Sequence, residues 1–314
     1  MNKIIKAKLI LWAIIGILML LVSCKDEKQP KDLAINSSNT VEDEKVFNKK
    51  ELPKDFKDYW YAGEAEISSY KLEQARYGEI REGTAVLIYV TEDFLPNIQV
   101  KTDSRNSNNI PVLKLNATKK FNTGVYPYSI MQSTFYPVSN NKHAVKISSS
   151  MQEWCGHVYA QLNNRDKFEV ISHSYFEGEA DKNLKLEKSI LENELWTQLR
   201  INPKSLPIGN LDIIPSFEFA RLQHVPIKTY KASATINKNT YTLNYPELNR
   251  TLAIVFNSNF PYDVLSWEET FKSGFGPNSQ ILTTRATKIK TIKSAYWQKN
   301  SNTDEILRET LKLN

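Results

Sequence analysis

A cysteine and a histidine separated by one residue form the most reactive pair of side chains in this sequence. In a β-strand, Cys155 and His157 would point to the same face, because successive side chains alternate between faces. A thiol beside an imidazole can serve as the nucleophile of a hydrolase or as part of a metal site. Neither an orienting third group nor further metal ligands can be placed beside them. A lone free cysteine is more often a small buried hydrophobe, so we predict no metal site and keep the hydrolase as an alternative.

Acidic residues lie close together in two places, but their spacing does not favour acid–base chemistry. Glu177, Glu179 and Asp181 alternate at the end of an expected hairpin, where carboxylates are usually solvated. The adjacent Glu268 and Glu269 would point to opposite faces of a strand. The chain has no P-loop and no G-x-S-x-G, H-E-x-x-H, C-x-x-C or G-x-G-x-x-G motif. We therefore expect a protein that is not an enzyme and predict no cofactor.

A basic and aromatic stretch near the C-terminal end of the chain could bind a polyanion. Residues 270–303 include no acidic residue. Four side chains of this stretch form a candidate ligand-binding set for an acidic polysaccharide: Lys288, Lys290, Lys293 and Trp297. The alternative interpretation is an ordinary solvated strand face.

The N-terminal residues 1–23 have the organisation of a bacterial lipoprotein signal peptide. Three lysines precede an apolar stretch, residues 9–22, which is shorter than most membrane-spanning helices. The stretch ends in Leu-Val-Ser-Cys, which resembles the lipobox of lipoproteins. We therefore expect Cys24 to be the lipidation site, modified by palmitate-type acyl chains that attach the mature protein to a membrane.

The charged residues after the lipobox suggest a more specific location. Lys25, Asp26 and Glu27 resemble the export signal that directs lipoproteins of Bacteroidota-type bacteria to the outer face of the outer membrane. We therefore expect a lipid-anchored outer-membrane protein, displayed at the cell surface or facing the periplasm. If Cys24 is acylated, Cys155 is the remaining cysteine, and an intrachain disulfide is excluded.

The net charge argues against nucleic acid as a partner. The chain has 41 basic and 35 acidic residues, an excess of six. Three of the basic residues lie in the signal peptide, so the excess in the mature chain is three. An excess this small over such a length does not indicate a nucleic-acid-binding surface.

Beyond the signal peptide the composition divides the chain into a tether and a folded domain. Residues 24–58 are polar and charged with few aromatics, which predicts an acylated cysteine followed by a disordered tether. Residues 59–314 are rich in aromatic and β-branched side chains separated by turn residues, which predicts a β-rich globular domain. Two prolines and a glycine near residues 200–210 mark a candidate seam between subdomains.

One hairpin and one helix can be predicted in detail. The runs 151–162 and 167–177 flank an Asn-Asn-Arg-Asp turn, and pairing across it would place Cys155 opposite Ser174 and His157 opposite Ser172. Leucines at four-residue intervals predict a helix over residues 184–200. We expect a mainly β fold, either an antiparallel sandwich or a half-open barrel, with one mid-chain helix.

Four segments together resemble an uncharacterised lipoprotein family of Bacteroidota-type bacteria: Phe56–Glu66, Gln152–His157, Tyr245–Leu252 and Trp267–Phe271. Members are often labelled "septum formation inhibitor Maf". True Maf proteins are nucleotide pyrophosphatases with an S-x-S-P-R-R motif, and this sequence lacks that motif. The resemblance implies an envelope lipoprotein and supplies no catalytic residues.

The sequence therefore leads to one principal functional hypothesis and two alternatives. The principal hypothesis is a non-enzymatic binding or structural module, anchored in the envelope, whose partner is another envelope protein or a surface polymer. One alternative is a carrier that holds a lipid or another apolar ligand inside a half-open barrel. The other is a hydrolase that uses Cys155 and His157.

Overall fold

The computed structural model describes most of the folded part of the chain, namely residues 51–104, 107–139 and 142–313. Phe47–Asn314 form one compact unit. This unit runs without a division through residues 200–210, where the sequence placed a candidate seam.

Several predictions concern residues that the structure does not describe. The signal peptide, the lipidation site Cys24 and the export signal Lys25, Asp26 and Glu27 lie outside the described residues. In the part of the chain that is described, no helix has the length and hydrophobicity needed to cross a membrane.

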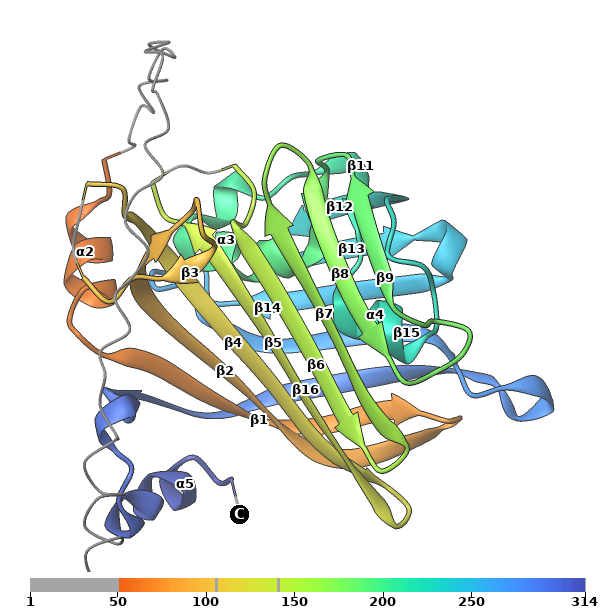
Figure 1. Ribbon diagram of the computed structural model, residues 1–314. Coiled ribbons are helices and arrows are strands. Elements are labelled where there is room, and N and C mark those ends of the chain that lie inside the picture. Colours follow the sequence, from red (N-terminus) through yellow and green to blue (C-terminus); the bar gives the residue numbers. More distant parts are fainter. Residues whose placement is uncertain (1–50, 105–106, 140–141, 314) are drawn as a thin grey trace, which may run out of the picture. The chain divides into compact units, whose positions relative to one another are not determined.

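The described residues form a 16-stranded, mostly antiparallel sheet (Figure 1). Its order is β10-β11-β12-β13-β14-β15-β16-β1-β2-β4-β5-β6-β7-β8-β9, and β3 pairs with β2. The strands are β1 (Ala65–Arg76), β2 (Glu79–Leu95), β3 (Val100–Lys101), β4 (Ile110–Thr123), β5 (Tyr126–Pro137), β6 (Lys146–Glu153), β7 (Gly156–Asn164), β8 (Phe168–Ser174), β9 (Lys182–Leu186), β10 (Ile190–Leu191), β11 (Gly209–Ile214), β12 (Tyr230–Asn237), β13 (Thr240–Tyr245), β14 (Arg250–Phe256), β15 (Val264–Ser273) and β16 (Gln280–Ser294). The mainly β class is therefore confirmed, with β10 and β11 as a parallel pair.

The helices of the described residues are short. They are α2 (Lys54–Trp60), α3 (Glu192–Ile201), α4 (Phe217–Leu222) and α5 (Ile306–Thr310), together with the 3₁₀ turns η1 (Pro203–Ser205), η2 (Pro246–Leu248), η3 (Gly276–Asn278), η4 (Tyr296–Gln298) and η5 (Asn302–Glu305). In Figure 1, β4 to β9 cross in front of β11 to β15, and α3 and α4 lie between the two halves of the sheet.

The curvature of the sheet creates the core. Alternate residues of the strands face inward, as in β14, where every second residue of Arg250–Phe256 is buried. Inward side chains from both halves form one cluster with Leu195 and Leu199 of α3, and Tyr70, Leu115 and Leu243 belong to it. The helix thus fills the space that the curved sheet encloses.

Two boundaries differ from the predictions. The helix predicted over residues 184–200 begins only at Glu192, because Leu184 and Leu186 belong to β9 and pack on β8 as strand residues. The predicted tether ends earlier than residue 58, because Lys54–Trp60 form α2. Phe56 and Trp60, four residues apart, lie on one side of this helix and are buried in the core.

Candidate functional site

The structure separates Cys155 from the strand in which the sequence placed it. Residues 151–162 form two strands, β6 and β7, and Cys155 lies in the turn between them. The hairpin of β7 and β8 exists, but Val158 lies opposite Ser174 and Ala160 opposite Ser172. The predicted register was therefore wrong by three residues, because Asn164 extends β7 into the region that we expected to be the turn.

The environment of Cys155 disfavours a reactive thiolate. Cys155 and His157 are both exposed, and Cys155 is a free cysteine. Its backbone N–H donates a hydrogen bond of 2.7 Å to a carboxylate oxygen of Glu153. A hydrogen bond to Glu153 raises the pKa of the Cys155 thiol, and less thiolate means a weaker nucleophile. Within the described residues, no group of three or more histidine, cysteine or acidic side chains could hold a metal ion.

The four basic and aromatic candidates near the C-terminal end do not form a single patch. Lys293 lies 4.1 Å from the Tyr59 ring and donates a hydrogen bond to the Tyr59 carbonyl oxygen, and burial lowers its pKa. Lys288 forms an ion pair with Asp263. Lys290 is three residues from Lys293 on the same strand and so points to the other face. Trp297 lies in η4, beyond the strand, and is partly exposed.

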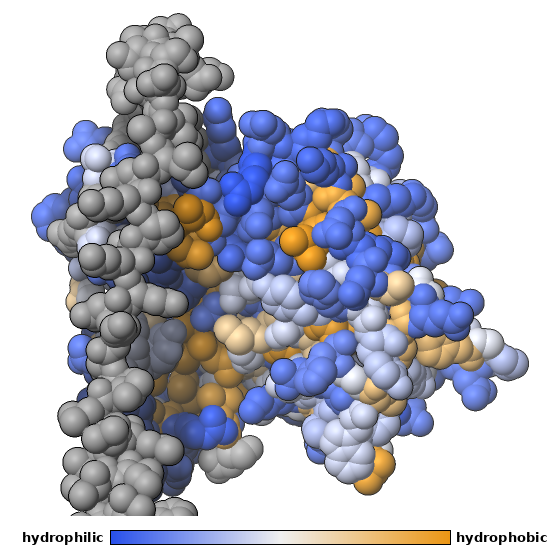
Figure 2. Space-filling model, in the orientation of Figure 1, coloured by the Kyte–Doolittle hydropathy of each residue, from blue (hydrophilic) through white to orange (hydrophobic). Residues whose placement is uncertain are grey.

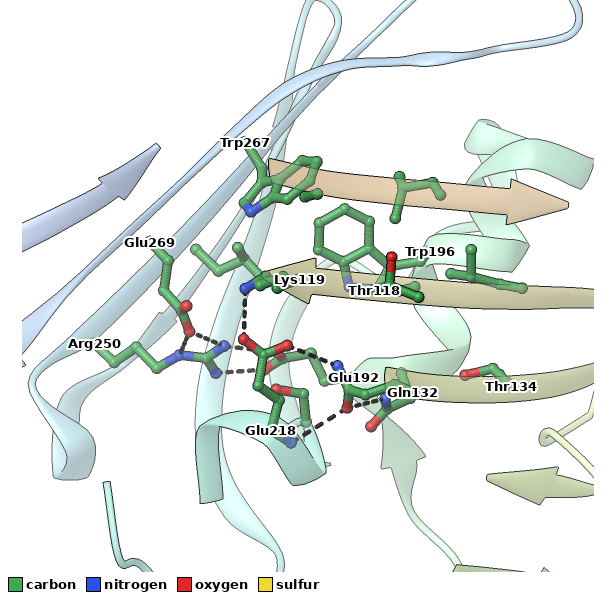
Figure 3. Close-up of a pocket in the computed structure, with 17 residues that line it drawn as sticks. Thr118, Lys119, Gln132, Thr134, Glu192, Trp196, Glu218, Arg250, Trp267 and Glu269 are labelled. Carbon is green, nitrogen blue, oxygen red and sulfur yellow. Dashed lines mark hydrogen bonds and ion pairs between the residues drawn. The ribbon is translucent and has the colours of Figure 1, made fainter. Parts of the chain in front are cut away.

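The structure reveals a pocket that the sequence did not indicate, inside the curved sheet (Figure 3). Two tryptophans line it, Trp196 of α3 and Trp267 of β15, whose ring centroids lie 5.4 Å apart at 89°. Ala85 of β2 and Ala117 of β4 line it as well. These alanines stand at inward positions where larger side chains would fill the space. The pocket has a volume of about 610 Å³ when the part open to solvent is counted.

An ion-pair network around Arg250 lies at the bottom of this pocket. The Arg250 guanidinium donates to both carboxylate oxygens of Glu192, at 2.5 and 2.6 Å, and to Glu269 at 2.7 Å. The Tyr245 hydroxyl also donates to Glu192, at 2.6 Å. The guanidinium carbon lies 4.0 Å from the centre of the Phe219 ring. Both carboxylates of this network therefore contact the one guanidinium, which holds them in a fixed geometry.

A second group of polar residues around Glu218 adjoins the Arg250 network (Figure 3). Ser216 caps α4 by accepting a hydrogen bond from a backbone N–H, and this turn places Glu218 in the pocket. Lys119 donates to Glu218 at 2.5 Å, and the Gln132 side chain donates to its other oxygen at 3.0 Å. Asn193 donates to Gln132 at 2.9 Å, which links this group to α3.

The carboxylates of the pocket differ in their proton affinity. Burial alone would raise the pKa of Glu192, but the charge and hydrogen bonds of Arg250 hold it below its usual value. Burial dominates at Glu218 and raises its pKa, although Lys119 opposes the shift. The pocket has three carboxylates, Glu192, Glu218 and Glu269, against two cations. Glu218 therefore takes up a proton more easily than Glu192 as the pH falls.

A signal for this pocket exists in the sequence, in charged residues at inward strand positions. Arg250 is in step with the inward apolar residues of β14, and Glu269 lies between Trp267 and Phe271 on the inward face of β15. Lys119 is likewise in step with Phe121 of β4. A charged residue at an inward strand position must find a buried partner. Sequence alone does not identify that partner, because the partner of Arg250 lies on a helix 58 residues away.

Large apolar side chains are exposed at the turns that join β4 to β5, β6 to β7 and β15 to β16. Val125, Trp154 and Phe275 lie in these turns and are largely exposed, with Trp154 at 69%. Ile281, at the start of β16, is exposed as well. In Figure 2, paler and more apolar residues gather at the bottom and right of the molecule, where these turns lie in Figure 1.

Comparisons with solved structures find only distant likenesses. One similar solved structure is a β-barrel-like protein of domain of unknown function DUF1849 from Brucella abortus, with a TM-score of 0.42 and 6% identity over 73% of this chain and 97% of that one. Another is a porin-like protein from Bacteroides uniformis, with a TM-score of 0.20 and 9% identity over 71% of this chain and 95% of that one. No protein-family model and no curated protein sequence matches the chain.

Proposed function

We propose that this protein is an outer-membrane lipoprotein whose β-rich domain binds a partner without catalysis. We also propose that the chain is related to the uncharacterised Bacteroidota-type lipoprotein family that its sequence resembles. The observation that carries it is the state of the pocket, where Arg250 and Lys119 are both committed to carboxylates. A pocket with aromatic walls and fixed polar groups is suited to holding a ligand group.

The expected partner is an envelope protein or an acidic surface polymer. A pocket of this size accommodates one side chain or one uncharged sugar ring, which would lie against Trp196 and Trp267. The exposed apolar turns, including Trp154 and Phe275, offer a larger surface of the kind that protein partners bind.

A crosslinking experiment with a blocked pocket tests this proposal. Ala117→Trp should fill the pocket. Lys120→Trp places the same side chain at an exposed position on the other face of β4. We expect a specific partner to be captured by the wild type and by Lys120→Trp, and lost with Ala117→Trp. Absence of any crosslinked partner, or equal capture by all three proteins, would count against the proposal.

The membrane anchor requires its own experiment. We expect metabolic labelling with a palmitate analogue to mark the wild type and not Cys24→Ser. Protease shaving of intact cells should then cleave the wild type and spare a variant with Lys25, Asp26 and Glu27 changed to alanine. If both are spared while lysed cells degrade both, the protein faces the periplasm.

A carrier of an apolar ligand is a second candidate function. The observation that favours it is a partly apolar slot between strands β6 to β9 and the helix α4. A carrier should retain lipid through purification, and mass spectrometry of the purified protein would detect it.

The hydrolase alternative has the least support. The exposed Cys155, with its raised pKa, should react with a thiol-directed probe no faster than a small-molecule thiol at neutral pH. A reaction about ten-fold faster, abolished by His157→Ala, would restore this alternative.

A further inference from the structure

The open side of the sheet contains a second, separate slot. Within the described residues, no hydrogen-bonded pairing joins β9 to β10 or β11, and the two ends of the sheet meet through side chains such as Leu184 and Ile214. The slot lies along this seam, between strands β6 to β9 on one side and α4 with residues 225–227 on the other. Its volume is about 600 Å³ when the part open to solvent is counted.

The walls of the slot are mainly apolar. They are formed by Met151, Val158, Ala160, Leu184, Phe217 and Ile227. Ser172 of β8 is a small residue among them, and it leaves room where a leucine would close the slot. Such walls suit an unbranched hydrocarbon chain, because each CH₂ group that leaves water adds to the binding free energy.

Charged residues line the same slot. Arg221 of α4, Lys182 of β9 and Glu179 contribute one more positive than negative charge. Arg221 donates to Glu179 at 2.9 Å, and His224 lies 2.7 Å from the same carboxylate oxygen. Lys182 shares the inward face of β9 with Leu184 and forms no ion pair with any described residue.

Arg221 has unused capacity for hydrogen bonding in the slot. Its side chain is only 9% exposed, and its guanidinium carbon lies 4.2 Å from the centre of the Phe176 ring. Its Nε–H is buried and has no hydrogen-bond partner among the described residues. A buried donor without a partner is costly, and a ligand oxygen would relieve that cost.

We propose that this seam slot binds an anionic amphiphile with a single alkyl chain. Its carboxylate or phosphate lies between Arg221 and Lys182, and its chain extends along the apolar walls. This inference deepens the carrier candidate and rests on it, but it does not depend on the tryptophan-lined pocket. That pocket has an excess of carboxylates, whereas the slot has an excess of cations.

Titration calorimetry with three ten-carbon ligands tests the charge selectivity. The protein is the chain from residue 24 onward with Cys24→Ser, so that no attached acyl chain competes. We expect decanoate or decyl phosphate to bind at least about ten-fold more tightly than decyltrimethylammonium, since about 1.4 kcal/mol of charge preference gives that ratio. The better of the two anions identifies the head group. Equal binding of all three ligands, or no binding of either anion, would overturn the inference.

Matched variants locate the site. We expect Arg221→Gln to weaken anion binding by about ten-fold and Lys182→Gln by about three-fold, the smaller effect reflecting an exposed charge. Lys185→Gln, on the opposite face of the same strand, should leave binding unchanged. Anion binding that is equally weakened by Lys185→Gln would place the ligand elsewhere.

A filled slot separates loss of the site from loss of the fold. We expect Ser172→Leu to abolish anion binding while the melting temperature is retained or raised. Retained binding in a folded Ser172→Leu protein would refute the slot. The pocket variant Ala117→Trp should bind the anion normally, so failure of the partner-binding proposal and failure of this inference remain distinguishable.

Discussion

At the scale of single residues, buried ion pairs determine which parts of the chain meet. Arg200 of α3 donates to both oxygens of Glu66 in β1, at 2.7 and 2.6 Å, and both side chains are 1% exposed. Tyr59 donates to the same carboxylate at 2.5 Å, which ties α2 to this pair. Arg250 and Glu192 join the other half of the sheet to α3 in the same way. Each pair specifies the position of α3 inside the sheet.

Removing only one partner of the Arg200–Glu66 pair should lower the free energy of unfolding more than removing both partners. We expect Arg200→Met to lower the free energy of unfolding by about 3–5 kcal/mol, because it leaves the Glu66 carboxylate buried without a cation. The double variant Arg200→Met/Glu66→Met should be more stable than the single variant, since no charge stays unpaired. Urea unfolding followed by tryptophan fluorescence measures both.

An exposed pair provides the control for this measurement. Arg285 and Glu268 lie 2.9 Å apart with both side chains more than half exposed. Arg285→Met should change the free energy of unfolding by about 0.5 kcal/mol or less. An Arg200→Met effect as small as this one would show that the buried pair is not needed for stability.

The raised pKa of Glu218 should make the free energy of unfolding depend on pH. Folded Glu218 holds its proton to a higher pH than it does in the unfolded chain, because burial penalises the carboxylate. Its stabilising contribution is complete below its unfolded pKa near 4.5 and is lost as the pH rises through its folded pKa. Glu218→Gln should therefore become more stable relative to the wild type as the pH rises from about 5 to about 8.

Urea unfolding across this pH range measures the difference between Glu218→Gln and the wild type. The exposed Glu268 provides a matched variant that also removes one carboxyl, and Glu268→Gln should change the free energy of unfolding by about 0.5 kcal/mol or less. A pH-independent difference between Glu218→Gln and the wild type would mean that the buried carboxyl titrates as it does in the unfolded chain.

At the scale of elements, α2 shows that a charged segment can be part of the core. Trp60 is fully buried, and its ring centroid lies 6.0 Å from that of Tyr89. Trp60→Ala should lower the free energy of unfolding by about 3–5 kcal/mol, because it leaves a large cavity. Tyr61→Ala, at the exposed neighbouring position, should change it by about 0.5 kcal/mol. Equal effects in thermal or urea unfolding would mean that α2 does not contribute to the core.

The elements also show how far the sequence could predict the structure. The β13 strand, Thr240–Tyr245, carries local signals, because it follows a Lys-Asn turn and its buried residues alternate. The start of α3 could not be predicted in this way, because Leu184 fits both a helical stripe with the later leucines and an inward strand face. Pairing with β8 decides between them, and that pairing is a tertiary contact.

The candidate site was less predictable than the fold for a related reason. Cys155 and His157 are the candidates that residue type alone suggests, and both lie exposed at a turn. The pocket residues are separated widely along the chain, from Ala85 to Glu269. Only the closure of β14 and β15 over β2 and β4 brings them together, and no local pattern encodes that closure.

At the scale of the whole molecule, the continuous sheet should make residues 47–314 unfold as one unit. The register of β1 against β16 runs from Ala65 and Ser294 to Glu73 and Arg285, so the N-terminal and C-terminal strands join the two halves of the sheet directly. α3 contacts both halves through the same core cluster. If the strands on either side of residues 200–210 unfolded separately, each half would expose its part of that shared cluster to water. Independent unfolding of the two halves is therefore disfavoured.

We therefore expect a single cooperative transition. Circular dichroism, which reports the sheet, should give the same urea midpoint as tryptophan fluorescence, which reports the shared core around Trp60, Trp196 and Trp267. In calorimetry the measured enthalpy should equal the van't Hoff enthalpy. A variant weakened at one end, such as Trp60→Ala, should shift both midpoints together. Two resolved transitions, of which Trp60→Ala moves only one, would show instead that the strands before and after residues 200–210 fold as separate subdomains.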